Sequence, residues 1–488
     1  MKNFKRLFCL AMCVCIAATC TVSFASAEEA NSTAPFRLSV TVNGDTAIGR
    51  GFCWYTAAQA DTKIEIEGLA ADAYTVSDAV CEEWDGNWMH KLVVSGLTKG
   101  TTYRYRVGDG TVWSEWGTFT TDDGDDKVSF INIADVQAGN LENFQKGAAT
   151  LTAGFTKLPN PDFVSNCGDF TNDSTNEEWD YYDEAFGALN RTYTIVPVSG
   201  NHDGLGVEYW FNNMFALDTT ESVQIKDGVN YSFDVGNAHF AVLNTNDVLS
   251  ISTAQLEWLE NDLKSTDKDW KIVFMHKAPY SLGKDAKWPD ALYLQECLPP
   301  IMAECNVDIV FYGHDHQYLR TKPLTNNQLD PDGTTWVLSG TAGSKRYEIR
   351  KFLAGHYMKT EFIDSLVIQK DGYGNFWTNG NWDTTSEGNI GGCFETVEIN
   401  GTELWLTTYI LNDKTGEINK VDEVGFNKKA GENKITFEGD NTTSETEYNL
   451  SLVPSFLGLA KYAITKWLPE FFKMLPALLE SVIVEDTF

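Results

Sequence analysis

The chain has 488 residues, of which 43% are hydrophobic and 13% aromatic, so it is long enough to form two or three domains with sizeable cores. Its 69 acidic residues outnumber the 37 basic ones and give a formal net charge of −32 at pH 7. Such a surface repels polyanions, so we expect neither nucleic acid nor an anionic membrane as a general partner. Attraction of an anionic substrate would have to be local, most simply through bound metal cations.

The first 27 residues have a basic start, an apolar stretch and an Ala-Ser-Ala end, which is typical of a secretory signal cleaved after Ala27. A lipoprotein signal at Cys20 is the alternative, but the preceding Ala-Ala-Thr lacks the large apolar residue expected there. Cleavage removes three basic residues and no acid, so the net charge becomes about −35. The mature protein is therefore predicted to be secreted or to sit at the cell surface.

Six cysteines remain after this cleavage, and none forms a Cys-x-x-Cys pair, which argues against a zinc finger. Export permits disulfides. Cys53 and Cys81 lie in the same predicted β domain, so they could form one. The other four could be buried thiols.

Residues 34–121 contain short segments in which apolar and polar residues alternate, separated by turns that carry glycine. Alternation with a period of two predicts the strands of a small β-sandwich. The segments contain no cluster of His or Asp, so we expect this domain to act as a spacer or brace. The predicted strands are 36–42, 49–56, 63–68, 90–97, 102–108 and 116–121.

The acidic stretch 121–126 is predicted to be a linker to a second domain, residues 127–437. In this second domain, apolar strand-like segments alternate with helical ones, which indicates a layered α/β fold. One helix is predicted to start at Ser252, which forms a capping box with Gln255. Its apolar residues share one face: Leu256, Leu259 and Leu263.

The last segment, residues 438–488, is a polar linker followed by apolar residues at helical spacing. Charged residues, Pro469 and Pro476 interrupt the apolar pattern, so a membrane-spanning helix is not expected. We interpret the segment as an amphipathic helical tail that folds onto the protein or a partner. Attachment to a membrane surface is the alternative.

Five times in the α/β region, a short apolar segment ends on residue types that bind metals. Ligands of open α/β sheets gather beyond the carboxyl ends of the strands, so these side chains are expected to meet. A single histidine after a strand is more often structural, but five such blocks favour a metal site. The residues concerned are Asp135, Asp169, Asn201, His202, His276, His314 and His316.

These blocks resemble the motifs of the calcineurin-like metallophosphoesterase superfamily. With the preceding β domain, which is similar to a fibronectin type III domain, the chain resembles the purple acid phosphatase branch. The resemblance extends to about Phe437 and implies a catalytic domain built as a β-sheet sandwich flanked by helices. The matching blocks are 134–137, 168–169, 200–203, His276 and 313–316.

The resemblance implies two metal ions bridged by Asp169. The first ion would be held by Asp135 and His316, and the second by Asn201, His276 and His314. In an extended segment, residues two apart point the same way, so His314 and His316 could each serve one ion of a pair about 3.5 to 4 Å apart. The intervening Asp315 is expected to be structural.

The implied reaction is hydrolysis of phosphate esters, most simply phosphomonoesters, by a metal-bound hydroxide. His202 would stabilise the transferring group and protonate the leaving oxygen, and Asp203 would orient His202. Tyr318 and Arg320 match an extension of the last motif and would support the ligands. Phosphodiesterase or nucleotidase activity is a variant within the class. The rival hypothesis is a catalytically weakened binding protein, against which the retained His202 argues.

Two positions depart from the family pattern. Gln137 stands at the histidine of the superfamily's Asp-x-His motif and could offer only a neutral amide oxygen to the first metal, or it could be structural. Asn172 stands where purple enzymes place a tyrosine ligand, so the tyrosinate that colours them is missing. The implied metals are Fe, Mn or Zn. Hard divalent ions such as Mn or Fe(II) suit an oxygen-rich site better than Fe(III) bound through a phenolate does.

Overall fold

A computed structural model describes residues 32–204, 210–218, 230–246, 251–283, 285–286, 288–348, 366–370, 376–378, 381–383, 390–428 and 435–438. The predicted signal segment and the predicted helical tail lie outside these residues. Within them, no helix has both the length and the apolar character needed to cross a bilayer.

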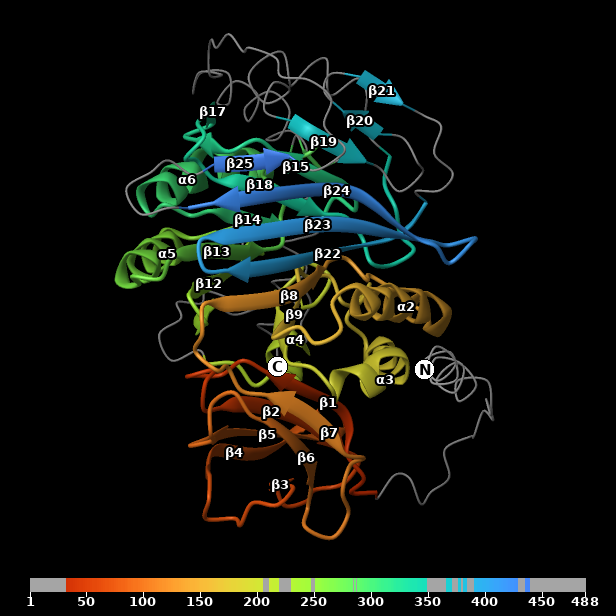
Figure 1. Cartoon of the computed structure of the whole chain (residues 1–488). Coiled ribbons are helices and arrows are strands. Elements are labelled where there is room, and N and C mark those ends of the chain that lie inside the picture. Colours follow the sequence, from red (N-terminus) through yellow and green to blue (C-terminus); the bar gives the residue numbers. More distant parts are fainter. Residues whose placement is uncertain are drawn as a thin grey trace, which may run out of the picture.

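The N-terminal part is a β-sandwich, drawn in red and orange in Figure 1. Aromatic side chains such as Phe52, Tyr105 and Phe119 pack between its two layers. The predicted strands are present, and the structure adds β4, whose side chains are mostly exposed and therefore show no apolar alternation. One layer has β1 (Phe36–Thr41), β2 (Arg50–Thr56), β5 (Asn87–Ser95) and β4 (Thr75–Trp84), and the other has β3 (Lys63–Ile66), β6 (Thr102–Gly108) and β7 (Gly117–Thr120).

The suggested disulfide between Cys53 and Cys81 is not formed, and all six described cysteines are free. Cys53 on β2 pairs with Lys91 of β5, and Cys81 on β4 pairs with His90 on the other side of β5. The two cysteines are therefore two strand spacings apart, roughly 9 to 10 Å. That separation exceeds the roughly 7 Å between Cα atoms that a disulfide can span.

Two large sheets face each other in the rest of the molecule. The first contains three parallel strands followed by an antiparallel meander: β8 (Lys127–Ile133), β9 (Phe163–Asn166), β10 (Ile195–Pro197), then β22 (Gly391–Asn400), β23 (Glu403–Asn412), β24 (Ile418–Asn427) and β25 (Ile435–Glu438). The second contains β11 (Tyr231–Val235), β12 (Ala238–Leu243), β13 (Trp270–Met275), β14 (Ile309–Tyr312), β18 (Thr335–Ser339), β15 (Tyr318–Thr321), β19 (Leu366–Lys370), β20 (Phe376–Thr378) and β21 (Asn381–Asp383). A small hairpin, β16 (Leu324–Thr325) and β17 (Gln328–Leu329), lies beside them.

Helices cover the outer faces of both sheets, which confirms the predicted layered α/β fold. The helix predicted at Ser252 is α5, and its capping box with Gln255 is present. Leu259 and Leu263 of α5 are fully buried against the second sheet. The helices are α2 (Leu141–Lys157) and α3 (Asn176–Asn190) on the first sheet, α5 (Thr253–Ser265) and α6 (Pro289–Glu304) on the second, and the short α4 (Trp210–Met214).

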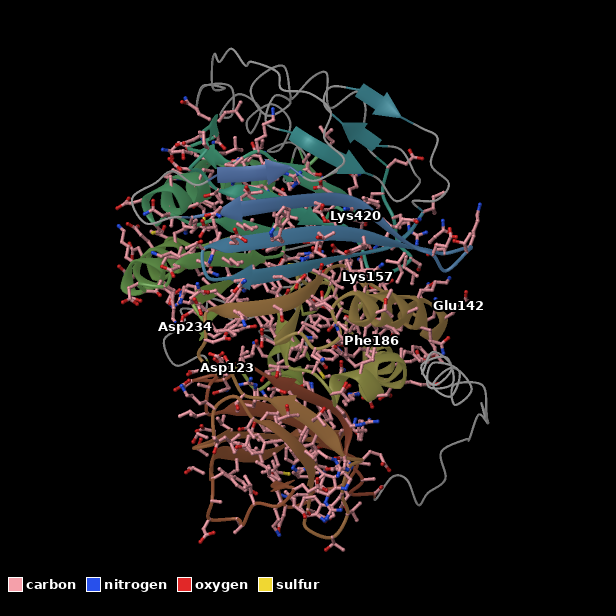
Figure 2. The ribbon with its side chains drawn as sticks, in the orientation of Figure 1. Asp123, Glu142, Lys157, Phe186, Asp234 and Lys420 are labelled. Atoms are coloured by element: carbon pink, nitrogen blue, oxygen red, sulfur yellow. The ribbon has the colours of Figure 1, made fainter. Side chains whose placement is uncertain are left out.

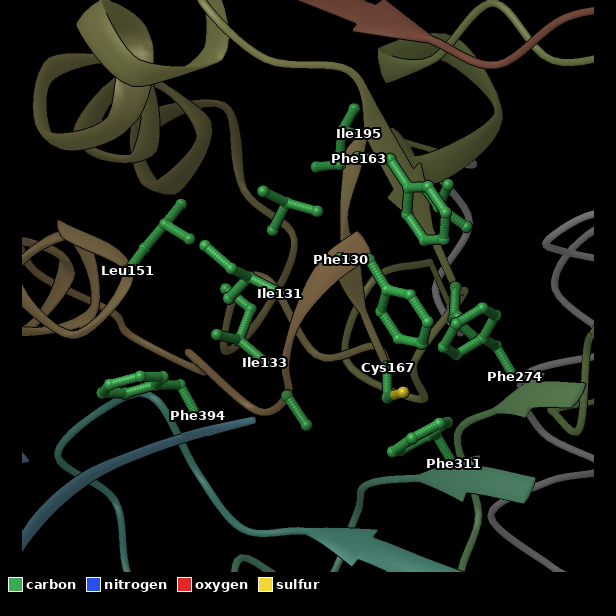
Figure 3. Close-up of a cluster of buried hydrophobic side chains, with 14 of the residues drawn as sticks. Phe130, Ile131, Ile133, Leu151, Phe163, Cys167, Ile195, Phe274, Phe311 and Phe394 are labelled. Atoms are coloured by element: carbon green, nitrogen blue, oxygen red, sulfur yellow. The ribbon is translucent and has the colours of Figure 1, made fainter. Parts of the chain in front are cut away.

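Successive side chains of β8 point to opposite faces of the first sheet and pack into two different parts of the core. Phe130 faces the second sheet, where its ring lies 5.7 Å from that of Phe274 and 5.8 Å from that of Phe311. Its neighbour Ile131 points the other way, toward Leu151 of α2 (Figure 3). Strand β8 is thus buried on both faces, and its carboxyl end is held firmly in position.

The N-terminal sandwich is joined to the second domain through a shared sheet rather than through the linker alone. Thr41 of β1 pairs in parallel with Ile195 of β10. Arg37 is buried and contacts α3, with its guanidinium 2.6 Å from Asp180 and its backbone N–H donating to Asp183 at 2.9 Å. We therefore describe the N-terminal part as a brace built into the first sheet.

A buried histidine ties β11, β12 and α5 together on the side of the molecule where Asp234 is labelled in Figure 2. The ring of His239 on β12 lies 2.8 Å from Asp234 and 2.9 Å from Asp262 of α5. Burial opposes a charge on this ring, but the two carboxylates outweigh it and raise the pKa of His239 to about 9. Lys268 lies 3.7 Å from Asp234 and balances part of the negative charge.

Replacing His239 with glutamine should therefore destabilise the protein in a pH-dependent way. A raised folded-state pKa gives stability that is fully present below pH 6.5 and is lost as the pH rises through about 9. We expect a loss of roughly 2 kcal/mol near pH 6, because Asp234 is half exposed and screened by solvent, and a smaller loss near pH 10. Urea unfolding of both proteins at the two pH values measures this. An equal difference at both values would contradict it.

Candidate metal centre

The five predicted strands all exist, and their carboxyl ends meet at one place. They belong to two facing sheets rather than to one open sheet: β8, β9 and β10 run parallel in the first, and β13 and β14 run parallel in the second. The loops that follow these strands carry Asp135, Asp169, Asn201, His276 and His314. The site thus lies at the shared edge of the sandwich.

The backbone at this edge differs from the extended conformation that we expected around His314 and His316. Both residues have positive φ, 79° and 49°, as do Asp135 (51°) and Asp169 (55°). The left-handed region costs about 1 to 3 kcal/mol for a residue with a side chain and is typical of functional sites. The two histidines therefore reach different neighbours because the chain twists between them, and not because the segment is extended.

Close approach of the loops explains a glycine beside the site. A Cβ atom on Gly200 would lie 2.0 Å from the backbone nitrogen of Asp169, so only glycine lets these loops touch. Asp169 then accepts a hydrogen bond from the backbone N–H of His202 at 2.8 Å. Contact between the loops fixes the carboxylate of Asp169 at the centre of the site.

The structure brings the acidic and histidine side chains into two groups that share one member. In each group, one potential ligand atom from each residue lies within 4.8 Å of the others. Asp169 belongs to both groups, which is the arrangement that a carboxylate bridging two ions requires. The first group is Asp135, Asp169 and His316, and the second is Asp169, His276 and His314.

The histidine rings are oriented by hydrogen bonds to backbone carbonyls. Nδ1 of His276 lies 2.8 Å from the carbonyl oxygen of Cys167, and Nδ1 of His316 lies 2.5 Å from that of Lys345. A carbonyl oxygen only accepts, so each Nδ1 carries the proton and each Nε2 is left for the site. This is the usual support of a metal-binding histidine. Nε2 of His276 is 2.9 Å from the amide oxygen of Asn201, so the two atoms are close enough to bind the same ion.

Electrostatics at the site favour a positive charge between the carboxylates. Burial lowers the pKa of His316 to about 3 and holds that of His314 well below its usual range, so both rings are neutral. For His276, burial opposes protonation, but Asp169 raises its pKa to about 9. Burial likewise raises the pKa of Asp135 well above its ordinary value. Burial also opposes the charge of Asp169, but His276 outweighs it and lowers the pKa of that carboxyl. It is therefore Asp135 that lacks a compensating charge, as in a site that binds metal cations.

Gln137 also fits a ligand-binding role. The residue is 4% exposed, and neither atom of its side-chain amide has a hydrogen-bond partner among the described residues. Its backbone N–H donates to the carbonyl oxygen of Asp169 at 2.8 Å, which places it beside the bridging residue. A buried amide without partners costs about 1 to 3 kcal/mol, so a bound group that satisfies it would be stabilising.

If Gln137 lends its amide oxygen to the first metal, Gln137→His should tighten that site by supplying a stronger donor. Gln137→Ala should weaken it, by roughly 10-fold. Metal titration of each variant against wild type measures both effects. Gln145→Ala, on the exposed side of α2, is the matched control. Equal affinity in wild type and both Gln137 variants would show that Gln137 is structural.

The structure gives Asp203 a different role from the predicted contact with His202. The carboxylate of Asp203 accepts hydrogen bonds from the backbone N–H groups of Phe170 at 2.7 Å and Gly200 at 2.9 Å. Nδ1 of His202 donates instead to the backbone carbonyl of Asn172. Asp203 therefore joins the two loops that carry Asp169 and His202, and it positions His202 only through the backbone.

Tyr318 and Arg320 are also placed differently from the expected support behind the ligands. The Tyr318 hydroxyl donates to Asp422 at 2.7 Å, and Nε of Arg320 lies 2.6 Å from the same carboxylate. All three residues are buried, and Asp422 lies on β24 of the other sheet. This cluster fastens β15 of the second sheet to the meander of the first.

Sequence reasoning missed two residues that flank the centre. The ring of Tyr347 stacks on that of His316 with centroids 4.4 Å apart, and the backbone carbonyl of Lys345 orients the same histidine. Both follow β18, a fully buried strand parallel to β14. No metal-ligand residue type follows β18 directly, so the sequence pattern that marked the other five strands is missing here. The only available signal was that β18 is a further buried strand, whose end should lie beside the others.

Comparisons with known proteins agree with this geometry. Residues 128–318, from β8 to the start of β15, match the calcineurin-like phosphoesterase family. Residues 20–121 match the purple acid phosphatase N-terminal domain, and the curated relatives are purple acid phosphatases. The chain therefore combines a calcineurin-like metallophosphoesterase domain with a purple acid phosphatase N-terminal domain, which confirms the resemblance seen in its motifs.

Individual relatives are distant. Purple acid phosphatase 22 of Arabidopsis thaliana is 26% identical over 272 residues, which cover 53% of this chain and 59% of the relative. A probable inactive purple acid phosphatase 27 from the same plant is 26% identical over 313 residues, covering 53% of this chain and 50% of the relative. The matches thus span little more than half the length of these relatives.

Among solved structures, the purple acid phosphatase PPD1 from yellow lupin, Lupinus luteus, shares the fold. It superposes with a TM-score of 0.62 at 18% identity, covering 80% of this chain and 74% of that one. The agreement confirms the predicted order of an N-terminal β domain followed by an α/β metallophosphoesterase fold.

Proposed function

We propose that this protein is an exported phosphoester hydrolase with a dinuclear metal centre, most simply a phosphomonoesterase. The observation that carries the proposal is the pair of ligand groups that share Asp169. The first ion would be held by Asp135, Asp169 and His316, with Gln137 as a further oxygen donor, and the second by Asp169, Asn201, His276 and His314. Two ions in this arrangement supply an activated water and charge stabilisation for the phosphoryl group.

The residues of the chain supply orientation and a proton. The carbonyl of Asn172 fixes Nδ1 of His202 as a donor, so a proton for the leaving oxygen would come from Nε2 of the doubly protonated ring, which keeps its Nδ1 proton. The backbone N–H of His202 donates to Asp169, which fixes the backbone of His202 beside the proposed bridging ligand. His202 is partly exposed, as are the proposed ligands Asn201 and His314, so a substrate could approach from solvent on this side, while Asp135, Asp169, His276 and His316 are buried.

The test is turnover by protein reconstituted separately with Mn, Fe or Zn. A set of phosphomonoesters, phosphodiesters and nucleotides identifies the substrate class. We expect close to two metal ions per chain and fastest hydrolysis of phosphomonoesters. Protein that binds both metals yet hydrolyses none of these compounds would favour the rival binding function, which the departures at Gln137 and Asn172 would then explain.

Export is tested on the same preparation. A mature protein that starts at Glu28, shown by mass spectrometry of protein secreted by its host, would support cleavage after Ala27. Retention of the first 27 residues would contradict it.

A further inference from the structure

Strand β12 also ends at the metal centre, although none of the residues after it was predicted to be a ligand. It pairs in parallel with β13, so its carboxyl end lies at the same edge as His276. The three residues that follow β12 are all polar, and each is at most 4% exposed. Polar side chains this deeply buried normally have hydrogen-bond partners, and the partners show what the segment holds in place. The three residues are Asn244, Thr245 and Asn246.

The side chain of Asn246 connects this segment to a loop of the other sheet. Its NH2 group donates to the backbone carbonyl of Ser199, which follows β10 and lies two residues before Asn201. The same group donates to Oδ1 of Asn244 at 3.2 Å. Both partners are acceptors, so the orientation of the amide is fixed. The amide oxygen of Asn246 is buried and has no partner among the described residues, so the NH2 group makes these contacts alone.

Helix α5 holds the segment in turn. Gln255 on α5 donates from Nε2 to the backbone carbonyl of Asn244 at 2.8 Å, and the N–H of Asn244 donates to Oδ1 of Asn230 at 2.7 Å. Gln255 is itself fixed by the capping box, in which the N–H of Ser252 donates to its Oε1 at 2.9 Å. The side chain of Asn246 therefore starts from an anchored backbone.

The middle residue of the segment, Thr245, holds the loop after β13. Its hydroxyl oxygen accepts the backbone N–H of Lys277 at 2.9 Å, and Lys277 directly follows His276. The ligand atoms of the two loops meet, since Nε2 of His276 lies 2.9 Å from the amide oxygen of Asn201. Thr245 and Asn246 thus fix the backbone on both sides of this contact.

These hydrogen bonds bear on the second ion more than on the first. Asn201 and His276 are proposed ligands of the second ion only, and they come from loops of different sheets. Their separation therefore depends on bonds that cross between the sheets, such as the one from Asn246 to Ser199. A site binds its ion tightly only when the ligands are held in position. Asn201 depends on this support most, because its amide carries no charge.

We propose that Thr245 and Asn246 are positioning residues for the second metal ion, and that they act by holding His276 and Asn201 at the separation the ion requires. Neither side chain contacts the ion or the substrate in this role. The inference rests on the proposed dinuclear centre and adds two residues that control the affinity of one of its ions. Loss of either hydrogen bond should therefore weaken the second ion selectively.

The test is stepwise titration of the purified, metal-free protein with Mn(II), followed by EPR, which distinguishes a single bound ion from a magnetically coupled pair. Asn246→Leu removes the NH2 group at similar size and should weaken the second ion roughly 10-fold, as loss of a group that orients a ligand typically does. Thr245→Val should weaken it too, and Thr245→Ser should restore the affinity because serine keeps the hydroxyl. The affinity of the first ion should change by less than about twofold in each variant.

Asn237→Leu is the matched control. Asn237 precedes β12 and donates from Nδ2 to the backbone carbonyl of Gly401 at 3.0 Å, so this variant loses the same kind of bond at the other end of the strand. It should unfold more easily in urea and still bind both ions with wild-type affinity. With Mn(II) in excess, Asn246→Leu should recover most of its turnover, since every ligand is still present.

Unchanged affinity for the second ion in both Asn246→Leu and Thr245→Val would overturn the proposal. Equal weakening of both ions would also overturn it, as would equal weakening of the second ion by Asn237→Leu, because the effect would then be a general loss of stability. If Asn246→Leu does not fold, the two Thr245 variants decide the question by themselves. Wild-type protein that binds fewer than two ions would contradict the proposed function instead, which is a different result.

Discussion

His202→Ala should lower kcat by about 10²- to 10⁴-fold while both metal ions stay bound. The imidazole belongs to neither ligand group, and the contact of His202 with Asp169 is through the backbone N–H, which alanine retains. The loss should fall on kcat and less on KM, because the proton is needed only as the leaving oxygen departs.

The measurement is steady-state hydrolysis of an aryl phosphate, together with metal analysis of the same sample. His239→Gln controls for a general loss of stability, since it is expected to destabilise the fold at a position on β12 that is away from the metal centre. Unchanged kcat in His202→Ala would remove this residue from the reaction. Loss of metal from the variant would reassign His202 as a ligand.

Asp169→Asn should remove both metals at once, with each affinity falling more than about 100-fold, and should abolish turnover. A carboxylate shared by two groups offers an oxygen to each ion, and an amide has only one oxygen and no charge. Residues that only hydrogen-bond to a metal ligand typically contribute 10- to 100-fold to metal affinity. A residue that is itself a ligand of both ions should therefore contribute more.

The discriminating comparison is with variants of residues that belong to one group. Asp135→Asn should weaken the first ion more than the second, and His276→Ala the reverse. Asp267→Asn, at an exposed position after α5, controls for loss of a negative charge. Independent loss of the two ions in Asp169→Asn would mean that Asp169 is not shared between them.

The architecture was predictable from sequence where the burial of an element leaves a local pattern. Helix α5 was found from its apolar periodicity and its capping residues, and the strands that precede the site blocks were found as short continuous apolar segments. Strand β4 was not found, since its exposed face carries no such pattern. The division of the parallel strands between two sheets was predicted only through the family resemblance, because strand periodicity does not say which strand pairs with which.

The candidate site was predictable in its residue types but not in its connections. Strand ends indicated which side chains would gather. The hydrogen-bond partners of Asp203 and Arg320 lie far from them in sequence. Asp203 binds the loop at 168–171, and Arg320 binds Asp422. The bend at His314 and His316 was misjudged because positive φ at a residue with a side chain has no simple sequence signal.

The pairing of β1 with β10 gives the N-terminal sandwich a protective role. Without it, β10 would be the last strand of the sheet, with its backbone N–H and C=O groups unpaired. Exposed edges of this kind recruit other strands and promote self-association. A metallophosphoesterase domain produced alone from residue 127 onward would therefore keep every ligand of the metal centre and still be prone to aggregate. The N-terminal domain thus covers a sheet edge that would otherwise be exposed, as well as bracing the catalytic domain.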